Sequence, residues 1–343
     1  MKAGVLYDVY DLRVEEIDKP EVQDEEVMIK VKANGICGSD VHFYEKGELG
    51  PFVVNEPYVP GHECSGEIVD VGRKVKGIER GDRVVIEPGI PCRKCEFCKE
   101  GRYNLCPEVV FLSAPPIDGT FSEYVSISYD FVYKIPSSMT YWEGALVEPA
   151  AVGVHACNRA GITAGNSVAV LGVGPIGLLT LQAAKAFGAI QILVVDILDH
   201  RLNLAGQLGA NSTINATEED ATQRILEVTE GKGVDVVFET AGSIQTSQLA
   251  VKIAKRGGKV VHVGWTNSKK FEYNIAEVME KELDIKGINR YANAFPTTIN
   301  LINDGKIKVK PLITHDFKLE NIDIAFDYVV SNKEEVIKAI VTS

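Results

Sequence analysis

The sequence lacks the features that would direct a chain into a membrane or out of the cell. The N-terminal residues "MKAGVLYDVY" contain no apolar signal segment, and no small-residue cleavage site follows them. The most apolar stretch, residues 168–184, is interrupted by residues that favour a strand, a turn and a buried helix over a membrane span: Gly172, Gly174, Pro175 and Gly177. There is no internal repeat and no low-complexity tract. We therefore expect a cytoplasmic globular protein with no membrane partner.

Positive charge is also scarce. The chain has 36 Lys and Arg residues against 48 Asp and Glu residues, a net charge of −12. Such a field repels the phosphates of nucleic acids, so we expect no nucleic-acid partner. An anionic cofactor must then be held locally, by backbone N–H groups or by a few basic side chains.

The cysteines argue against a disulfide framework, because seven is an odd number and cytosolic thiols stay reduced. Four of them follow C-x2-C-x2-C-x7-C in "PCRKCEFCKEGRYNLC": Cys92, Cys95, Cys98 and Cys106. Four thiolates at this spacing can surround one tetrahedral Zn²⁺ with no open position, which predicts a structural metal site. Cations between the cysteines would offset its negative charge: Arg93, Lys94, Lys99 and Arg102.

Two other uses of these cysteines stay open at this point. One is an iron–sulfur cluster, although the similar iron–sulfur motif has a shorter final spacing. That motif carries Pro after its last Cys, and Pro107 follows Cys106 here, so spacing alone does not exclude it. The other is a redox-active cysteine pair.

A chain of 343 residues is too long for one ordinary core and predicts two domains. Up to about residue 135, short β-branched segments with period-two alternation predict an all-β body, as in "EVMIKVKANGIC" and "DRVVIEP". From about Tyr141, strands alternate with helices, as in "SVAVLG", "QILVVD" and "VDVVFETAG". This alternation predicts a parallel sheet with helices on both faces. We expect the last fifty or so residues to return to the first domain.

A glycine-rich turn between a strand and a helix predicts a dinucleotide site. Gly172, Gly174 and Gly177 have the G-x-G-x-x-G spacing in "VAVLGVGPIGLL". The first glycine permits the tight turn, the second lets the backbone approach a pyrophosphate, and the third lets helix and strand pack closely. The helix N-terminus adds free N–H groups. We therefore assign the whole turn, with Pro175 and Ile176, to cofactor binding.

The end of the next strand favours NAD over NADP. Asp196 can accept hydrogen bonds from the adenosine ribose hydroxyls and would repel a 2′-phosphate. Ile197 and Leu198 add no positive charge, although Arg201 is near and is included among the cofactor-binding residues. The alternative is a glycine-rich turn in a fold that binds no nucleotide. Strand, turn, helix and acid in register argue against it.

A second metal site needs donors outside the four-cysteine run. Cys37 lies in "GICGSDVH", and His62 and Glu63 lie in "PGHECSGE". A thiolate, an imidazole and a carboxylate plus water form the ligand pattern of a catalytic zinc. Glu148 is a further acidic candidate at the junction of the two domains. Each residue also has a plainer interpretation: a lone Cys is usually a small buried hydrophobe, and a His–Glu pair is usually structural.

The chain resembles the zinc-containing medium-chain alcohol dehydrogenases along essentially its whole length. The motifs that carry the resemblance are "GICGSD", "GHECSGEIVDVG", "GDRVVIEP", the four-cysteine run and "GVGPIGLLTLQAAKAFGA". Within that family it is most similar to the polyol dehydrogenases of sorbitol and xylitol type, through "CGSDVHFY", "APPIDGTF", "GALVEPAAVGVHAC" and "GINRYANAFP".

The resemblance implies an α/β protein with a β-rich catalytic domain. We expect a GroES-like all-β lobe over residues 1–150 and 290–343. A Rossmann domain with a doubly wound parallel sheet would bind NAD over residues 151–289. The resemblance also implies a homo-oligomer, either a dimer or a tetramer.

The resemblance further implies roles for individual residues. Cys37, His62 and Glu63 match the catalytic zinc set, and Glu148 matches an acidic residue that binds the metal directly or through water. Ser39 and His42 match positions linked to proton release. Four residues match the substrate pocket: Phe43, Glu148, Arg290 and Tyr291. Phe43 replaces a Tyr that is common in relatives, which removes one hydroxyl from the expected pocket.

Together these features predict a zinc- and NAD-dependent dehydrogenase that oxidises a secondary alcohol of a sugar alcohol to the ketose. The metal would stabilise an alkoxide that gives hydride to the nicotinamide, and we expect a cleft between the lobes to hold both. The alternatives are a dehydrogenase of the same fold for L-threonine or 2,3-butanediol, a zinc-independent quinone reductase, and a non-catalytic NAD-binding protein. "RYANAFP" favours a polyol, and the metal donors argue against the last two.

Overall fold

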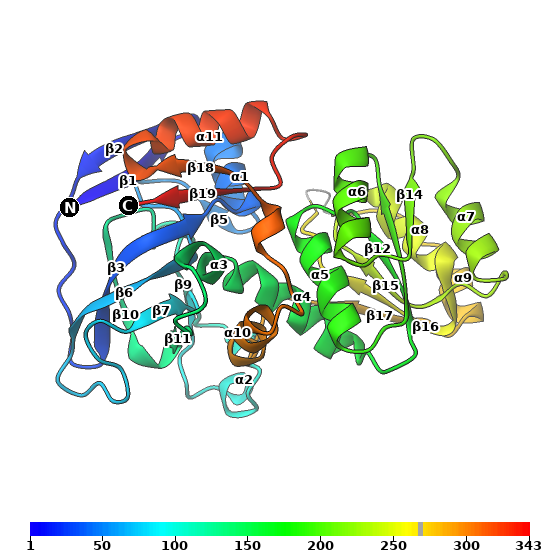
Figure 1. Ribbon diagram of the computed structural model, residues 1–343, viewed down its shortest axis with the longest axis horizontal. Helices are drawn as coiled ribbons and strands as arrows, with labels where there is room; N and C mark the ends of the chain where they lie inside the picture. Colours follow the sequence, from blue (N-terminus) through cyan, green and yellow to red (C-terminus); the bar gives the residue numbers. More distant parts are fainter. Residues whose placement is uncertain (267–269) are drawn as a thin grey trace. The chain divides into compact units, whose positions relative to one another are not determined.

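The structure, a computed structural model, describes residues 1–266 and 270–343 (Figure 1). Contacts divide the chain into two compact units: unit 1, Met1–Glu148 with Val309–Ser343, and unit 2, Pro149–Lys308. No helix in the described ranges is long and apolar enough to cross a membrane.

The chain returns to unit 1 later than the sequence predicts, at Val309 instead of residue 290. The backbone N–H of Lys308 donates to Oε1 of Gln182 at 2.7 Å, and Nε2 of Gln182 donates to the Lys308 carbonyl at 3.3 Å. These bonds tie the end of the segment to α5 (Pro175–Ala186), so residues 290–308 belong to unit 2.

Unit 1 is built on a mainly antiparallel sheet with the strand order β11-β7-β6-β3-β19-β18, and β10 also pairs with β3. The strands are β3 (Glu26–Gly35), β6 (Glu63–Val71), β7 (Arg83–Ile86), β10 (Tyr124–Ser128), β11 (Val132–Lys134), β18 (Ile313–Lys318) and β19 (Lys338–Thr342). Val27, Ile29 and Val31 alternate along β3, are at most 1% exposed and share one apolar cluster. This is the period-two pattern that the sequence predicts.

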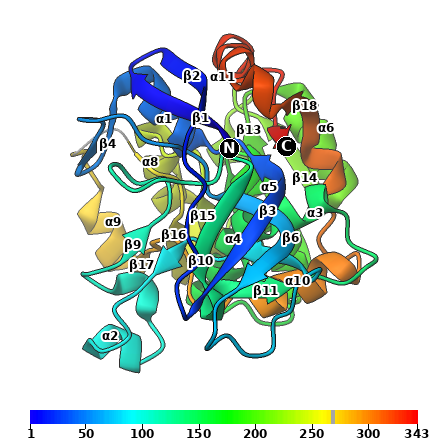
Figure 2. The same ribbon diagram turned by 90° about the vertical axis from the view of Figure 1, so that its left-hand side faces the viewer.

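Short elements surround this sheet. The strand pairs are β1 (Lys2–Asp8) with β2 (Asp11–Glu16), β4 (Glu48–Leu49) with β5 (Phe52–Val53), and β8 (Gly89–Ile90) with β9 (Val110–Phe111). The helices are α1 (Gly38–Lys46), α2 (Glu96–Lys99), α3 (Tyr141–Ala145) and α11 (Ile322–Ser331), with 3₁₀ turns η1 (Tyr103–Leu105), η2 (Tyr129–Phe131), η3 (Lys310–Leu312) and η4 (Leu319–Asn321). Figure 2 shows α11 beside β2, and α1 packs against α11. The boundary between the units falls inside α4 (Val147–Ala160).

Unit 2 is a parallel sheet in the order β14-β13-β12-β15-β16-β17. The strands are β12 (Ser167–Leu171), β13 (Gln191–Asp196), β14 (Ser212–Asn215), β15 (Val234–Glu239), β16 (Ala254–His262) and β17 (Asp284–Gly287). The helices are α5, α6 (Asp199–Leu208), α7 (Ala221–Val228), α8 (Ile244–Ile253), α9 (Ile275–Glu280) and α10 (Phe295–Asn303). Figure 1 shows α5 and α6 on one side of the sheet and α7, α8 and α9 on the other.

The sequence of β12 reflects this two-sided cover, because all four residues from Val168 to Leu171 are fully buried. The strand order reverses direction between β12 and β15, and dinucleotides bind at such a switch point in doubly wound folds. The all-β body and the parallel sheet predicted from the sequence are therefore confirmed.

A carboxyl group lies inside unit 1, between β7 and β8. Glu87 is 1% exposed and accepts hydrogen bonds from the hydroxyls of Tyr103 at 2.8 Å and Tyr133 at 2.9 Å. Burial raises the pKa of Glu87 from 4.5 to about 7, and the two phenols offset only part of this effect. Between these values Glu87 is more protonated in the folded chain than in the unfolded chain. The contribution of Glu87 to stability therefore falls as the pH rises from 4.5 to about 7.

We expect Glu87→Gln to flatten this pH dependence. The substitution removes the charge that disfavours the folded state above neutral pH, a gain of up to about 3 kcal/mol. Thermal unfolding between pH 5 and pH 8 measures the effect. The variant should be more stable than wild type at pH 8 and equally stable at pH 5. Glu218→Gln, an exposed control on unit 2, should leave the slope unchanged. An unchanged slope in Glu87→Gln would contradict the prediction.

Candidate active site

Strand pairing in unit 1 brings together the residues predicted as the catalytic metal set. Cys37 follows β3 and precedes α1, while His62 and Glu63 stand at the start of β6. The two strands are antiparallel neighbours with Gly35 opposite Glu63. One donor atom from each of the three residues therefore lies within 4.8 Å of the others. A thiolate, an imidazole and a carboxylate at this separation suit Zn²⁺.

The close approach depends on Gly35. A Cβ at this position would lie 1.9 Å from Oε2 of Glu63, so a larger residue leaves no room for the carboxylate. His62 is 5% exposed and Glu63 is 1% exposed, whereas Cys37 is partly exposed. The donor set is thus buried on the side of the imidazole and carboxylate, and more open at the thiol.

Asp40 connects two of the predicted donors. One of its oxygens lies 3.4 Å from Nδ1 of His62 and accepts a hydrogen bond from Ser113 at 2.8 Å; the other accepts the N–H of Cys37 at 3.0 Å. Burial alone would raise the pKa of Asp40 and lower that of His62. Their mutual attraction instead lowers the pKa of Asp40 and raises that of His62. A carboxylate at Nδ1 leaves Nε2 available to a metal.

Asp40 is not among the residues predicted from the sequence, although the sequence contains a signal for it. Cys37 is the N-cap of α1 and Asp40 is its third residue, the position from which an acidic side chain bonds back to the N-cap N–H. An acid three residues after a proposed metal-binding Cys at a helix start therefore indicates a side chain close to that Cys.

Lys338 also belongs to this cluster. Its Nζ donates to both oxygens of Glu63, at 2.7 and 2.8 Å, and both side chains are nearly fully buried. Burial alone would lower the pKa of Lys338, but the negative charges of Glu63, Cys37 and Glu148 raise it. No signal in the sequence marks this residue, because a Lys in the last strand resembles an ordinary surface residue.

The predicted proton-release residues lie on the helix that Cys37 begins. Ser39 and His42 are three residues apart on α1, so they share a face of the helix, and both are partly exposed. Glu148 is 7% exposed near the start of α4 and acts electrostatically on Lys338.

Two of the predicted substrate residues are placed in apolar cores. Phe43 is 4% exposed, and its ring stands edge-on to Tyr58 with centroids 6.2 Å apart. Tyr291, in unit 2, is 3% exposed and packs edge-on against Phe295 at 5.4 Å. These placements favour packing roles, and contact with substrate stays a prediction for both. Arg290 has a left-handed backbone with φ 53°, a strained conformation that often marks functional positions.

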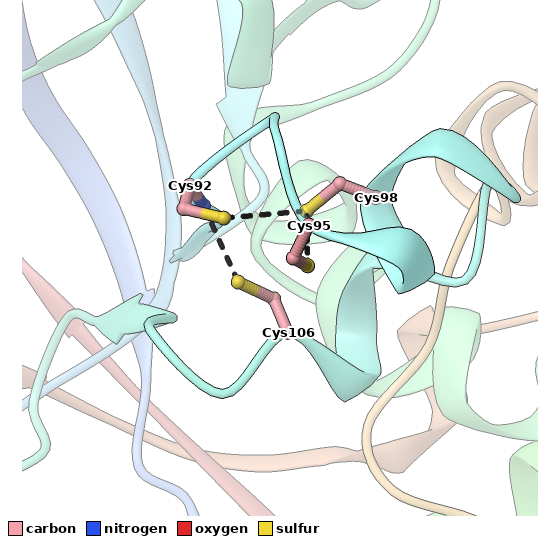
Figure 3. Close-up of side chains that lie close together, drawn as sticks. All are labelled: Cys92, Cys95, Cys98 and Cys106. Carbon is pink, nitrogen blue, oxygen red and sulfur yellow. Dashed lines mark hydrogen bonds between the residues drawn. The ribbon is translucent and has the colours of Figure 1, made fainter.

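The sulfur atoms of the four-cysteine run converge in unit 1 (Figure 3). Cys98 Sγ lies 3.4 Å from Cys95 Sγ and 4.0 Å from Cys92 Sγ, and the N–H of Cys92 donates to Cys106 Sγ at 3.3 Å. Sulfurs about 2.3 Å from one zinc are roughly 3.8 Å apart in a tetrahedron. The observed separations therefore fit a single ion and are short for a cluster in which each iron binds its own thiolate. Backbone N–H groups lower the pKa of Cys92 to about 7, which favours the thiolate.

The charges around these cysteines differ from the expectation. Arg93 pairs with Asp130 at 2.7 Å, Arg102 with Glu100 at 3.2 Å, and Lys94 with Glu108 at 3.7 Å. Each of these three cations therefore has a carboxylate partner, which reduces the positive charge that it offers to the thiolates. Arg93 also donates to Ser128, which fixes the cysteine loop to the end of β10.

The glycine-rich turn of unit 2 has the predicted geometry. Gly172 has φ 89°, and a Cβ there would lie 2.7 Å from that of Ala241. A Cβ at Gly177 would lie 2.0 Å from the Gly172 carbonyl oxygen. At Gly174, the N-cap of α5, the nearest atom to an added Cβ is 3.8 Å away. The turn thus leaves space over the helix N-terminus, where residues 175–176 form the first turn and a pyrophosphate can bind.

Asp196 does more than the sequence predicts. Its Oδ2 accepts the Val173 N–H at 2.6 Å, and its Oδ1 accepts the N–H groups of the next two residues at 2.8 and 3.1 Å. The carboxylate therefore fixes both the glycine-rich turn and the chain after β13. Arg201 lies beside the glycine-rich turn: its Nη1 would be 3.8 Å from a Cβ added at Gly174.

Comparison with known proteins agrees with this geometry. The family model described as an alcohol dehydrogenase GroES-like domain matches residues 23–137, and the model of a zinc-binding dehydrogenase matches residues 175–304. Sorbitol dehydrogenase of Bacillus subtilis is 44% identical over 341 residues, which cover 99% of this chain and 97% of that protein. The chain belongs to the zinc-containing medium-chain alcohol dehydrogenase family.

Solved structures of other dehydrogenases and oxidoreductases have the same fold as this chain. An Escherichia coli oxidoreductase of unknown specificity has a TM-score of 0.96 and 42% identity, over 99% of this chain and 98% of that chain. The 2R,3R-butanediol dehydrogenase of Bacillus subtilis has a TM-score of 0.91 and 35% identity, over 100% and 99% of the two chains. Zinc and a nicotinamide dinucleotide are the cofactors of the dehydrogenase: the two donor sets fit the metal, and the cradle at Gly174 fits the dinucleotide.

We expect the dehydrogenase to hold two zinc ions per chain with separable roles. Cys37→Ser should remove one ion and abolish turnover with little change in the thermal midpoint. Cys95→Ser should remove the other ion and lower the midpoint. Metal analysis by mass spectrometry with thermal unfolding measures both effects. Cys64→Ala, a control cysteine outside both sets, should keep two ions. A single ion in the active wild-type protein contradicts the prediction.

We expect Asp196→Ala to lower kcat/KM for NAD by about 10- to 150-fold, the equivalent of a charge-assisted hydrogen bond of about 1.5–3 kcal/mol. Adding Ile197→Arg should raise kcat/KM for NADP, because a cation replaces the repelling carboxylate. The control is Asp199→Asn, which changes a nearby acid and should keep the cofactor preference. Equal kcat/KM of the unmodified enzyme for NAD and NADP would contradict this interpretation of Asp196.

Proposed function

We propose that the protein is a zinc- and NAD-dependent polyol dehydrogenase. It oxidises a secondary alcohol of a sugar alcohol, of sorbitol or xylitol type, to the ketose. The carbon-bound hydrogen passes as hydride to NAD⁺ and the hydroxyl proton is released, which gives NADH. The observation that carries the proposal is the convergence of Cys37, His62 and Glu63, of which the last two are buried. Three protein donors leave one position of a tetrahedral zinc for the substrate oxygen.

Zinc held by this set supplies a Lewis acid for the reacting oxygen. The residues around it orient the donors and move the proton. Asp40, 3.4 Å from Nδ1 of His62, would orient its ring, and Lys338 holds the carboxylate of Glu63. Ser39 and His42, on one face of α1 and partly exposed, would pass the released proton to solvent. Glu148 would bind the metal directly or through water.

Unit 2 supplies the nucleotide site of the proposal. The N-terminus of α5 offers backbone N–H groups to the pyrophosphate, over the space that Gly174 leaves. Asp196 is held in place by three backbone N–H groups and presents its charge to the ribose. Arg201, beside Gly174, adds positive charge at the turn. This arrangement supports NAD as the preferred acceptor.

Two observations support a polyol substrate, and one favours a second candidate. Sorbitol dehydrogenases of Bacillus subtilis and Bos taurus are 44% and 43% identical to the chain. The segment "GINRYANAFP", which contains Arg290 and Tyr291, resembles the substrate pocket of the polyol dehydrogenases. Oxidation of 2,3-butanediol is the second candidate, because a butanediol dehydrogenase has a similar structure and Phe43 lacks the hydroxyl that a long polyol could use.

The finer parts of the proposal concern assembly and location. The family resemblance supports a homo-oligomer, as a dimer or a homotetramer. We also propose a cytoplasmic location, in keeping with seven cysteines that form no disulfide bond in the structure. Xylitol stands beside sorbitol as a proposed substrate on the resemblance of "GINRYANAFP".

A substrate panel tests the proposal: sorbitol, xylitol, ribitol, L-threonine and 2,3-butanediol, each with NAD and NADP, followed by nicotinamide absorbance. A sugar alcohol with NAD should give the highest kcat/KM. Preference for 2,3-butanediol would select the second candidate, and no turnover of any alcohol would overturn the proposal.

In the same panel, Arg290→Ala should reduce kcat/KM on the best polyol far more than on 2-propanol. A guanidinium offers several directed donors to a polyhydroxyl chain, and correct orientation is worth orders of magnitude in rate. Arg290→Lys keeps the charge but not the planar fork, and should fall in between. Equal losses of kcat/KM on both alcohols, with zinc content unchanged, would mean that Arg290 supports the fold and does not bind the polyol.

A further inference from the structure

The last strand of the chain places a buried ammonium against the proposed metal set. Lys338 begins β19 and is 4% exposed. Its Nζ donates to Oε1 and Oε2 of Glu63 at 2.7 and 2.8 Å, and to the carbonyl oxygen of Ile36 at 3.0 Å. An ammonium group has three donor hydrogens, so these three acceptors use all of them.

The register of three strands dictates this contact. β19 pairs with β3, with Ile340 opposite Gly35, and side chains two residues apart on a strand share a face. Lys338 therefore points to the same face as Ile340. β3 also pairs with β6, with Gly35 opposite Glu63, and the missing side chain of Gly35 leaves the space that the carboxylate fills.

Lys338 contacts both of the chain segments that carry the proposed metal donors. The carbonyl that it binds belongs to Ile36, the residue before Cys37, and the carboxylate that it binds belongs to Glu63. It thereby holds the two segments that carry the thiol and the carboxylate. Both oxygens of Glu63 already accept from the ammonium, so a metal ion must share an oxygen with Lys338 or displace it.

The charges of the site point to competition between the two cations. The thiolate of Cys37 and the carboxylate of Glu63 together balance a divalent ion, and Lys338 adds one positive charge beside it. Like charges repel strongly in surroundings from which water is excluded. Glu148 is a further anion that acts on the same ammonium.

We propose that Lys338 is a positioning residue that competes with the metal for Glu63: it holds the carboxylate in place before the metal binds, and its charge limits how tightly the bound metal is retained. A partly shared carboxylate leaves the ion more electrophilic, which favours loss of the proton from the substrate hydroxyl. The inference rests on the proposed function, because it requires zinc at Cys37, His62 and Glu63.

The test is the rate at which zinc passes from the protein to the chromogenic chelator 4-(2-pyridylazo)resorcinol. Cys37→Ser lacks one of the proposed ions and thereby identifies the release phase of the catalytic site. Lys338→Met and Lys338→Gln remove the charge, and each should slow this phase at least tenfold. Lys338→Arg keeps the charge and should release zinc at the wild-type rate. A release from both neutral variants that is as fast as wild type, or faster, overturns the inference and shows a purely structural Lys338.

Two further outcomes are decisive. If both neutral variants fail to fold while Lys338→Arg folds, the charge serves the fold and the inference is overturned. After cobalt replaces zinc, stronger carboxylate binding should shift the visible spectrum of the neutral variants but not that of Lys338→Arg; an unchanged spectrum opposes the inference. If wild type and Cys37→Ser release zinc identically, the metal assignment of the proposed function has failed, which is a different result.

Discussion

The pairing of β3 with β6 is the constraint on which the metal site depends. It sets Gly35 opposite Glu63, so the strand that leads to Cys37 ends beside the strand that begins after His62. The carboxylate occupies the volume that a side chain at Gly35 would need. A one-residue slip would turn Glu63 to the other face of the sheet and leave Lys338 buried without its partner. The register of this pair therefore couples the fold to the chemistry.

The features that the sequence predicted are those encoded by residues close together in the chain. Spacing within one loop determines which sulfurs can converge, and Cys92 to Cys106 do converge. The glycine-rich turn is equally local, because a positive φ at Gly172 and a close contact at Gly177 are needed wherever that turn occurs. The alternation of apolar residues along β3 likewise predicts, from the strand alone, which of its side chains are buried. Cys37 comes from a different segment than His62 and Glu63. Donor chemistry and the family resemblance suggested this group, and the pairing of β3 with β6 brings the three residues together.

The features that the sequence did not predict arise from contacts between distant residues. Lys338 and Glu63 are 275 residues apart, and nothing near either residue in the sequence indicates the other. The partner of Arg93 is Asp130, on a different element, so its charge was assigned to the thiolates instead. The return to unit 1 at Val309 depends on how Lys308 bonds to α5. Hydrophobicity and local propensity carry no information on any of these pairings.

An acidic protein that binds an anionic dinucleotide must keep its own negative charge away from the phosphates. Unit 2 does this by directing carboxylates at backbone N–H groups. Asp196, after β13, accepts three of them, and Glu239, at the end of β15, accepts those of residues 241 and 242 and the Thr246 hydroxyl. These bonds shape the loops at the carboxyl edge of the sheet and partly neutralise both acids. The net charge of −12 therefore does not describe the field at the glycine-rich turn, where the N-terminus of α5 adds a positive partial charge.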